Sequence, residues 1–526
     1  MIHPSVIFNT PEEQGAYVRN WVKERCGFEP TGMKLDFYPG RYATDKYSII
    51  PVGDVSDYIT DDKHDVAVLE EPEHLNWYHH GERWSDKFKH VVGVVHTNYL
   101  EYARTEENGR AKEAVLKVIN SWVSRVHCHK IIKLSDAVQD FPRSETMNVH
   151  GVSPVFLDVG EKKAAAAAAA AEAAAEAAAK KKKDAAAASA VGRAVNRVLA
   201  SLTARHVTAG AAAASAEANS NASAALKTKQ RGRGGGPGGG YFGSGSKRGK
   251  RGHGGSEGDA GTTDGNDDSA EASAAAAASR DGNAGGGEGE IFSKGCYFLG
   301  KVVWGKGFHE LLQRVEEHNS SAEGSSCPLE MDVYGSGEDL ESVTRRARDK
   351  NLPLQFRGRV DHASDQMHDY KVFINPSLSD VVATTTAEAL AMGKFAIVAE
   401  HPSNVFFSTF PNCMTYSTPE EFTQCVKRAL STDPRPLSRR DHYRLSWEAA
   451  TDRFLDAAEL GEEQRNGPGT GRGDRMAEVM AHALHKGLAS VEPVRVAAGA
   501  GPGTLRPPDK LDATWNPQPW GEWKKR

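Results

Sequence analysis

Two carboxylates in the C-terminal half of the chain have the chemistry and spacing of a sugar-binding site. Asp380 and Glu388 are separated by seven residues. Carboxylates accept hydrogen bonds from sugar hydroxyls, and the backbone N–H groups at a helix start bind phosphate. A nucleotide sugar carries both groups, so the pair favours a donor site. Two acids at this spacing also occur by chance in α/β proteins, and this structural interpretation stays open.

The elements that would position the two acids follow from the same stretch. Phe373–Asn375 end an apolar run typical of a buried strand, and Ala387–Met392 are good helix formers. Thr384–Thr386 offer hydroxyls for an N-cap, and Phe395–Ala399 predict a second buried strand. In a doubly wound sheet the strand ends and helix starts face the ligand, so both acids are expected to border it.

Other strand ends carry candidate residues of lower specificity. Gly335 and Gly337 follow a predicted strand and precede a predicted helix, where they would let a nucleotide approach the backbone. A lone G-x-G is weak evidence. Lys301 and Lys306 also follow a predicted strand, and their spacing alone is compatible with a solvated turn. His96 follows a fully apolar strand, either facing the ligand or capping the backbone.

The segment from Glu70 to Trp84 is rich in His, Trp and acidic residues. Aromatic side chains with one apolar face and one polar edge can stack on sugars or lie at a membrane interface. We therefore predict an acceptor-binding loop formed by Trp77, Tyr78, His79 and Trp84. The alternatives are a surface loop with satisfied histidines, or a metal site whose ligand spacing fits no standard zinc pattern. Its ligands would be Glu73, His74, His79 and His80.

Composition restricts the class of protein. The chain has 526 residues and a formal net charge of −5, which gives no global argument for binding nucleic acid or an anionic membrane. No charge-free run of about 18 apolar residues predicts a membrane span, apart from weakly hydrophobic alanine tracts. Six cysteines without C-x-x-C spacing suggest neither a zinc site nor a disulfide framework. A reducing compartment fits best.

The stretch around the two acids resembles the E-x7-E signature of family 4 glycosyltransferases, with Asp380 in place of the first Glu. The resemblance is closer still to the branch of that family that makes galactolipids, and it covers about residues 6–160 and 291–455. Further strings that carry it are EEPEHLNWYHHGERW from Glu70, VVGVVHTNYLEYAR from Val91, NVHGVSPVFL from Asn148, FSKGCYFLGKVVWGKGF from Phe292, DVYGSGED from Asp332, EHPSNVFF from Glu400 and LSWEAATDRF from Leu445.

The resemblance implies an α/β protein of the GT-B class, with two Rossmann-like domains facing a cleft. It implies that Lys301 and Lys306 hold the donor diphosphate, with Lys301 where the family commonly has Arg. It further implies that Glu388 accepts from the ribose, and that Asp380 and His96 position the sugar. The catalytic set is then His96, Lys306 and Asp380. The donor set also includes Gly335, Gly337, Thr384 and Thr385.

The implied reaction moves galactose from UDP-galactose to monogalactosyldiacylglycerol with retention, giving digalactosyldiacylglycerol with an α linkage. No cofactor and no metal ion is expected, since fixed cations and a helix dipole would stabilise the leaving group. The resemblance implies a peripheral protein on the chloroplast outer envelope membrane that faces the cytosol. Its expected partners are the galactolipid acceptor and the membrane surface, with no specific nucleic acid.

Composition shifts divide the chain into five parts. We expect a first Rossmann-like domain over 1–160 and a disordered Ala/Gly/Lys-rich insertion over 161–290, whose Ala-rich start has excellent helix composition. A second Rossmann-like domain follows over 291–440, then a crossover helix over 441–460 and a mostly disordered tail over 461–526, with one further helix near 475–490. The family begins with an extra strand and a Gly-rich turn, so the first domain is expected to lack its first strand.

Other functions stay open. The chain fits another family 4 enzyme with a different donor or acceptor. It also fits a non-enzymatic protein that binds RNA or membrane through the Gly/Arg-rich part of the insertion. The expected loss of the opening strand is compatible with an incomplete gene product or an inactive paralogue.

Overall fold

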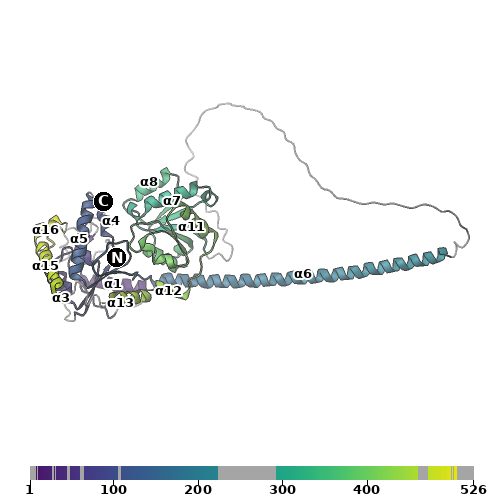
Figure 1. Cartoon of the computed structure of the whole chain (residues 1–526), viewed down its shortest axis with the longest axis horizontal. Helices are drawn as coiled ribbons and strands as arrows, with labels where there is room; N and C mark the ends of the chain where they lie inside the picture. The colour runs from purple at the N-terminus through teal and green to yellow at the C-terminus, as the bar shows by residue number, and fades with distance from the viewer. Residues whose placement is uncertain are drawn as a thin grey trace, which may run out of the picture. The chain divides into compact units, whose positions relative to one another are not determined.

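The computed structural model contains two parallel α/β sheets, one before and one after the long insertion (Figure 1). It describes residues 8, 10–26, 29, 31–43, 48–59, 64–104, 108–222, 292–459, 472–498, 500 and 503–505. The part before the insertion is called the first lobe below, and the part after it the second lobe. Two parallel sheets confirm the expected α/β class with two Rossmann-like lobes.

The second lobe is built on a six-stranded parallel sheet in the order β12-β11-β10-β7-β8-β9. The chain moves outward from β7 in one direction and from β10 in the other, so the switch point at which ligands bind lies between these two strands. The strands are β7 (Lys294–Leu299), β8 (Met331–Tyr334), β9 (Leu354–Gly358), β10 (Tyr370–Asn375), β11 (Phe395–Ala399) and β12 (Cys413–Tyr416).

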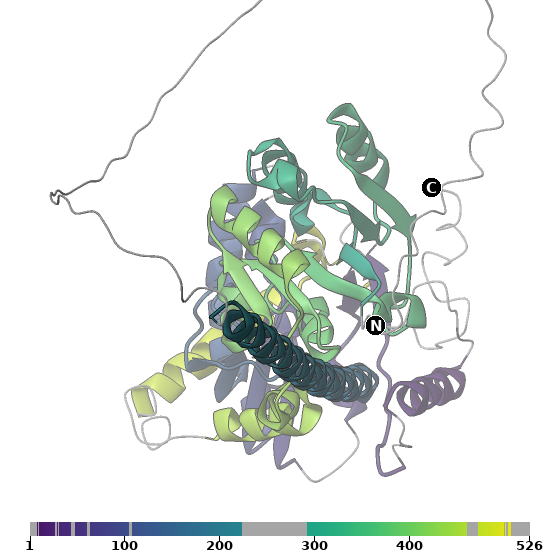
Figure 2. The same ribbon diagram turned by 90° about the vertical axis from the view of Figure 1, so that its right-hand side faces the viewer.

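Helices cover both faces of this sheet (Figure 2). Successive side chains of a strand alternate between the faces, so Tyr297 and Phe373 pack in one core while Phe298 and Ile374 pack in the other. Burial on both faces explains why these strands are continuous apolar runs. The helices are α7 (Phe308–Ser320), α8 (Leu340–Asp349), α9 (Asp365–His368), α10 (Thr384–Ala391) and α11 (Pro419–Ser431).

The first lobe contains a four-stranded parallel sheet in the order β3-β4-β5-β6 and a separate antiparallel pair, β1 and β2. Its strands are β1 (Gly40–Ala43), β2 (Ser48–Pro51), β3 (Val66–Glu70), β4 (His90–Val95), β5 (Lys130–Lys133) and β6 (Ser144–Thr146). Its helices are α1 (Pro11–Cys26), α2 (Pro72–Asn76), α3 (Trp84–Lys87), α4 (Tyr99–Arg104) and α5 (Gly109–His127).

The C-terminal part of the chain returns to the first lobe, as predicted. After α12 (Arg439–Leu445), α13 (Trp447–Ala458) packs Phe454 against Val92 and Ile132 of the first-lobe sheet. Two further helices follow, α15 (Arg472–Ala489) and α16 (Glu492–Ala497), and α15 packs on α5. The tail therefore contains more structure than the sequence suggested, although its helix near 475–490 is confirmed.

The insertion begins inside a helix. Helix α6 (Pro154–Ala222) starts in the segment that links the lobes, where Phe156 and Leu157 join a core of the second lobe. It continues well beyond the Ala-rich start, because alanine favours helix without needing a core. Lys163 Nζ lies 4.1 Å from the ring centroid of Phe292, where the chain re-enters the second lobe. The Gly/Arg-rich stretch lies within 223–291, outside the described residues.

Candidate functional site

The switch point of the second sheet holds an ion pair between Lys306 and Asp380. Lys306 ends a short 3-10 turn after β7, and Asp380 lies in the loop after β10. Lys306 Nζ donates to Asp380 Oδ1 at 2.6 Å, and Asn375 Nδ2 lies 3.3 Å from Asp380 Oδ2. Burial acts to lower the pKa of Lys306, but the adjacent Asp380 carboxylate outweighs it and raises the pKa. Two predicted catalytic residues are thus in direct contact.

The second predicted lysine has a different partner. Lys301 Nζ lies 3.0 Å from Glu338 Oε1, and about half of each side chain is exposed. The predicted glycines pack against the loop that carries Lys301. A Cβ at Gly335 would lie 1.8 Å from the Gly300 carbonyl oxygen, and one at Gly337 would lie 2.1 Å from that of Val302. Both glycines are therefore required by loop packing, and their predicted contact with the nucleotide stays a prediction.

The start of α10 differs from the prediction in its capping. The N-cap is Ala383, with no side-chain hydrogen bond to the helix, so the predicted N-cap role of Thr384–Thr386 is wrong. These threonines form the first helical turn instead. Thr384 is exposed and Thr385 half-buried, while Thr386 is buried with its hydroxyl 3.5 Å from Asn375 Nδ2. Asn375 thereby connects the helix start with Asp380.

Glu388 is held by a hydrogen-bonded chain that the sequence did not reveal. His362 Nδ1 lies 2.6 Å from Glu388 Oε2, and His362 Nε2 lies 2.7 Å from the Tyr297 hydroxyl. His362 is 5% exposed, whereas the Glu388 side chain is 22% exposed, so the carboxylate is fixed on one side and accessible on the other. His362 follows β9, so the rule that strand ends face the ligand would have identified it.

In the first lobe, His96 follows β4 and lies between two acids. His96 Nε2 is 3.2 Å from Glu70 Oε2, and His96 Nδ1 is 3.3 Å from Glu71 Oε1. The hydrogen bond to Glu70 and the nearby acids raise the pKa of His96, although burial opposes them. Behind it, Glu73 is buried, and burial raises the pKa of its carboxyl to about 8.

His150 connects the two lobes electrostatically. Burial lowers its pKa, the charge of Glu388 on the second lobe opposes that shift, and His96 on the first lobe adds to it. Tyr102 on α4 of the first lobe likewise acts on the pKa of Lys306. Groups from both lobes therefore lie within electrostatic range of one another. His150 follows β6 and, like His362, was missed although it occupies a strand end.

The predicted acceptor segment is largely engaged in packing. His79 and Trp84 are 5% and 4% exposed, and Trp84 Nε1 donates to Asn76 Oδ1 at 2.9 Å. The segment contains α2 and the start of α3, so it is less of a loop than predicted. Trp77 Nε1 donates to Asn120 Oδ1, and the Tyr78 hydroxyl donates to the Ala498 carbonyl, each at 2.8 Å. Their predicted contact with an acceptor stays a prediction.

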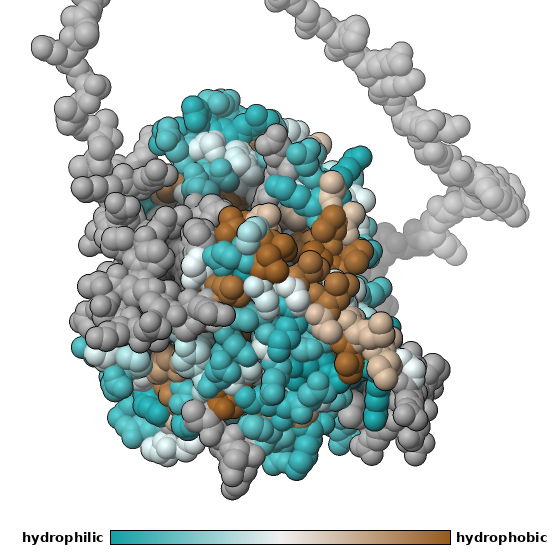
Figure 3. All heavy atoms as spheres, turned by 90° about the vertical axis from the view of Figure 1, so that its left-hand side faces the viewer, coloured by the Kyte–Doolittle hydropathy of each residue, from teal (hydrophilic) through white to brown (hydrophobic). Residues whose placement is uncertain are grey.

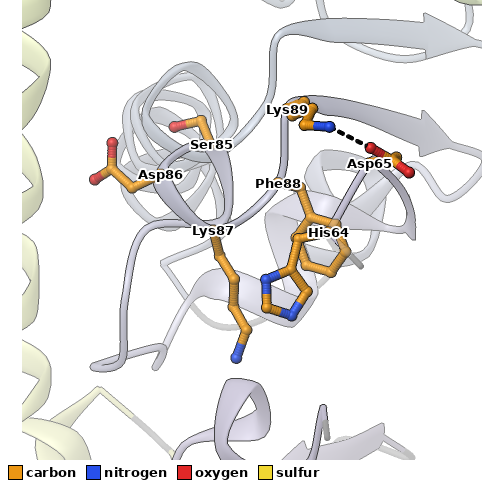
Figure 4. A pocket seen from close by; sticks show the side chains of 7 residues that line it. All are labelled: His64, Asp65, Ser85, Asp86, Lys87, Phe88 and Lys89. Carbon is orange, nitrogen blue, oxygen red and sulfur yellow. Dashed lines mark hydrogen bonds and ion pairs between the residues drawn. The ribbon is translucent and has the colours of Figure 1, made fainter. Parts of the chain in front are cut away.

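A surface pocket in the first lobe lies away from these residues. It is lined by His64, Asp65, Ser85, Asp86, Lys87, Phe88 and Lys89 (Figure 4). Asp65 and Lys89, whose side chains are 2.6 Å apart, directly precede β3 and β4, whereas His96 follows β4. The six residues of β4 span roughly 20 Å, so this pocket lies at the N-terminal ends of the strands, whereas His96 lies at their C-terminal ends. Among the described residues, no group of three or more His, Cys, Asp or Glu could hold a metal ion.

Comparisons with known proteins decide the family. Residues 293–432 match the family model described as glycosyl transferases group 1. Digalactosyldiacylglycerol synthase 2, chloroplastic, of Arabidopsis thaliana is 35% identical over 522 residues, which are 97% of this chain and 84% of that protein. The chain belongs to the digalactosyldiacylglycerol synthase family. Its GT-B class and the resemblance to family 4 glycosyltransferases are thereby confirmed.

Other members of the digalactosyldiacylglycerol synthase family are longer. Digalactosyldiacylglycerol synthase 1 of Glycine max is 40% identical over 88% of this chain and 43% of its own length. That of Lotus japonicus is 38% identical over 96% of this chain and 51% of its own length. The chain thus spans about half the length of these relatives. The solved lipopolysaccharide outer core galactosyltransferase WaaB is 13% identical, with a TM-score of 0.27 over 31% of this chain and 48% of that one.

The geometry at the second-lobe switch point suits a charged donor. Lys306 supplies a half-buried cation whose present partner is Asp380, so an incoming diphosphate can replace that carboxylate and keep the ammonium group paired, while Asn375 Nδ2 stays beside Asp380. The exchange would make the Asp380 carboxylate available to sugar hydroxyls. Glu388, fixed by His362, offers its other oxygen to a second set of hydroxyls. This arrangement can bind a diphosphate between two hydroxyl-bearing groups.

Proposed function

We propose that the chain is a galactosyltransferase that moves galactose from UDP-galactose to monogalactosyldiacylglycerol and retains the configuration of the donor. Membership of the digalactosyldiacylglycerol synthase family supports this proposal. The observation that carries it is the contact between Lys306 and Asp380 at the switch point, with Glu388 on the helix that follows.

Each donor group then has a specific role. Lys306, with Lys301 at the rim, binds the diphosphate and stabilises the charge that develops on departing UDP. Glu388 accepts hydrogen bonds from the ribose hydroxyls, and His362 holds it in position. Asp380, released from Lys306, accepts from the galactose hydroxyls. In this proposal, the fixed cations stabilise the charge on departing UDP without a metal ion.

The reaction replaces one bond at the sugar. The bond between the anomeric carbon and the phosphate oxygen breaks, and the acceptor hydroxyl forms a new bond to the same carbon on the same face. The hydroxyl proton passes to the departing phosphate oxygen, so atoms and charge balance. His96, held between Glu70 and Glu71, orients the galactose. The acceptor is a membrane lipid, and we place the protein at the cytosolic side of the chloroplast outer envelope as a peripheral enzyme. No helix in the described part of the chain could span a bilayer.

The test is transfer by the full chain. Radiolabelled UDP-galactose and monogalactosyldiacylglycerol in mixed micelles should give a labelled digalactosyl product that an α-galactosidase cleaves. UDP-glucose and a GDP-sugar serve as matched donors and should give little product. A product resistant to α-galactosidase would reject retention. Transfer from another donor, with none from UDP-galactose, would identify a different glycosyltransferase.

A further inference from the structure

Helix α15 packs on the first lobe through its polar side. Glu478 lies 3.7, 3.6 and 3.4 Å from the guanidinium groups of Arg83, Arg125 and Arg143. One and two turns further on, His482 and His485 contact the ring of His127, and His485 Nε2 lies 3.2 Å from the Trp77 carbonyl oxygen. Glu478, His482 and His485 thus face the protein.

The apolar side of α15 faces outward as a consequence. Its exposed residues recur every fourth position, which places them in one line along the helix. They are Met476, Met480, Leu484 and Leu488, which are 57, 66, 58 and 46% exposed. A surface helix normally turns its apolar side toward the core, so α15 is inverted with respect to the lobe on which it packs.

Neighbouring helices enlarge this surface. Val115 and Val118 on α5 are 60 and 67% exposed, and Val494 and Val496 on α16 are also exposed. Figure 3, which views the side of the molecule that carries α15 and α16, shows apolar residues gathered into one patch. We call the exposed apolar residues of α5, α15 and α16 the α15 face. Soluble monomers rarely expose a large contiguous apolar patch without an interaction partner.

The exposed charges on α5, α15 and α16 are mainly positive among the described side chains. Arg475 and Lys486 on α15 are exposed, as are Lys112 and Lys117 on α5. The described acids on these three helices are engaged elsewhere. Glu478 faces the lobe, Glu492 accepts a hydrogen bond from the Gly503 backbone, and Glu113 pairs with Arg104 at 2.7 Å. The apolar stripe therefore lies between cations.

We infer that the α15 face docks on the surface of a lipid bilayer that contains anionic headgroups. An apolar stripe between basic residues is the pattern of helices that lie in the membrane interface. A second copy of the chain fits less well, because a twofold contact through this face would bring the same cations together. The inference rests on the proposed function, in which the acceptor is a membrane lipid, and specifies where the enzyme meets that membrane.

Flotation of the full chain with vesicles tests the inference without donor or acceptor. Wild-type protein should bind vesicles of phosphatidylcholine with phosphatidylglycerol. Leu484→Glu should reduce the partition coefficient about tenfold or more, because it removes a leucine that inserts into the bilayer and adds an anion that the headgroups repel. Leu455→Glu is the matched control, since Leu455 on α13 is also 58% exposed, and it should bind like wild type. Lys486→Glu should weaken binding to these vesicles more than to pure phosphatidylcholine.

The thermal midpoint and light scattering are measured on the same variants. Leu484→Glu should leave the thermal midpoint unchanged, because the side chain faces away from the lobe. Equal flotation of wild type and Leu484→Glu would overturn the inference, as would a wild-type dimer that this variant converts to monomer in light scattering. If the wild-type chain binds vesicles but shows no galactose transfer, the proposed function is rejected and the inferred membrane contact through the α15 face still stands.

Discussion

The second-lobe switch point and the aromatic segment of the first lobe were both predicted as ligand sites, but their polar atoms are used differently. At the switch point, Lys306 and Asp380 bond to each other and stay partly exposed, so a ligand can replace either partner. In the aromatic segment, the Trp84 indole is bonded to Asn76 and buried. Residue type alone therefore does not distinguish a ligand contact from a packing contact; what does is whether the polar group remains exchangeable.

Replacing Trp84 should give the largest effect, and on stability. Trp84→Ala removes a 4% exposed indole and leaves Asn76 Oδ1 without its indole donor, so the free energy of unfolding should fall by about 3–5 kcal/mol. Denaturant titration measures it. Trp447→Ala, at a 47% exposed tryptophan, should cost far less. A stable Trp84→Ala protein with a raised KM for the lipid would instead make Trp84 an acceptor contact.

Replacing Lys306 should act on catalysis. Lys306→Ala should lower kcat for galactose transfer by about 10²-fold or more, because it removes a fixed cation beside the leaving diphosphate. Lys301→Ala is the comparison, and its effect should be smaller since Lys301 is half exposed and paired at the rim. Single-turnover rates separate the two. Equal losses of kcat in both variants would show that Lys306 stabilises the leaving diphosphate no more than Lys301 does.

His362 should act as a positioning residue. His362→Asn removes the hydrogen bond that holds Glu388, so the KM for UDP-galactose should rise about tenfold, the equivalent of about one hydrogen bond to a charged group, with kcat little changed. Tyr297→Phe keeps His362 and loses only the hydroxyl, so it should have a smaller effect of the same kind. A fall in kcat at unchanged KM would contradict the positioning role.

Glu73 should give a pH dependence of stability in the first lobe. Burial raises its folded pKa to about 8, above its ordinary value of 4.5. The folded state therefore binds more protons than the unfolded chain. Its contribution to stability is fully present below about pH 4.5 and is lost as the pH rises to about 8.

The isosteric variant Glu73→Gln removes this titration. The difference in unfolding free energy between about pH 5 and about pH 8 should shrink by about 1–3 kcal/mol relative to wild type. Glu12→Gln, at an exposed carboxylate on α1, is the control and should change that difference little. Parallel pH dependence in wild type and Glu73→Gln would show that the Glu73 carboxyl is not protonated in the folded state.

The sequence predicted most of what depends on local pattern. Buried strands such as Phe395–Ala399 and the crossover of α13 were found because apolar runs and helical spacing are local properties. Asp380 was placed at the ligand by the rule for strand ends and Lys306 by the family resemblance, but their direct contact was not predicted. The hydrogen-bonded chain from Glu388 through His362 to Tyr297 was missed, because it joins three segments that are distant in sequence. The absent threonine cap and the inverted α15 were missed for a related reason, since each depends on tertiary packing that outweighs propensity.

The contact between Lys163 and Phe292 has a consequence for how the chain tolerates its long insertion. The ammonium group over the aromatic ring brings together the two points between which the extra residues leave and return. The two ends of the insertion are therefore held together by this contact. The distance between the lobes does not depend on the number of inserted residues. Doubling such a segment costs only about 0.6 kcal/mol in closure entropy. Residues can accumulate there over evolution while the distance between Lys306 and His96 is preserved.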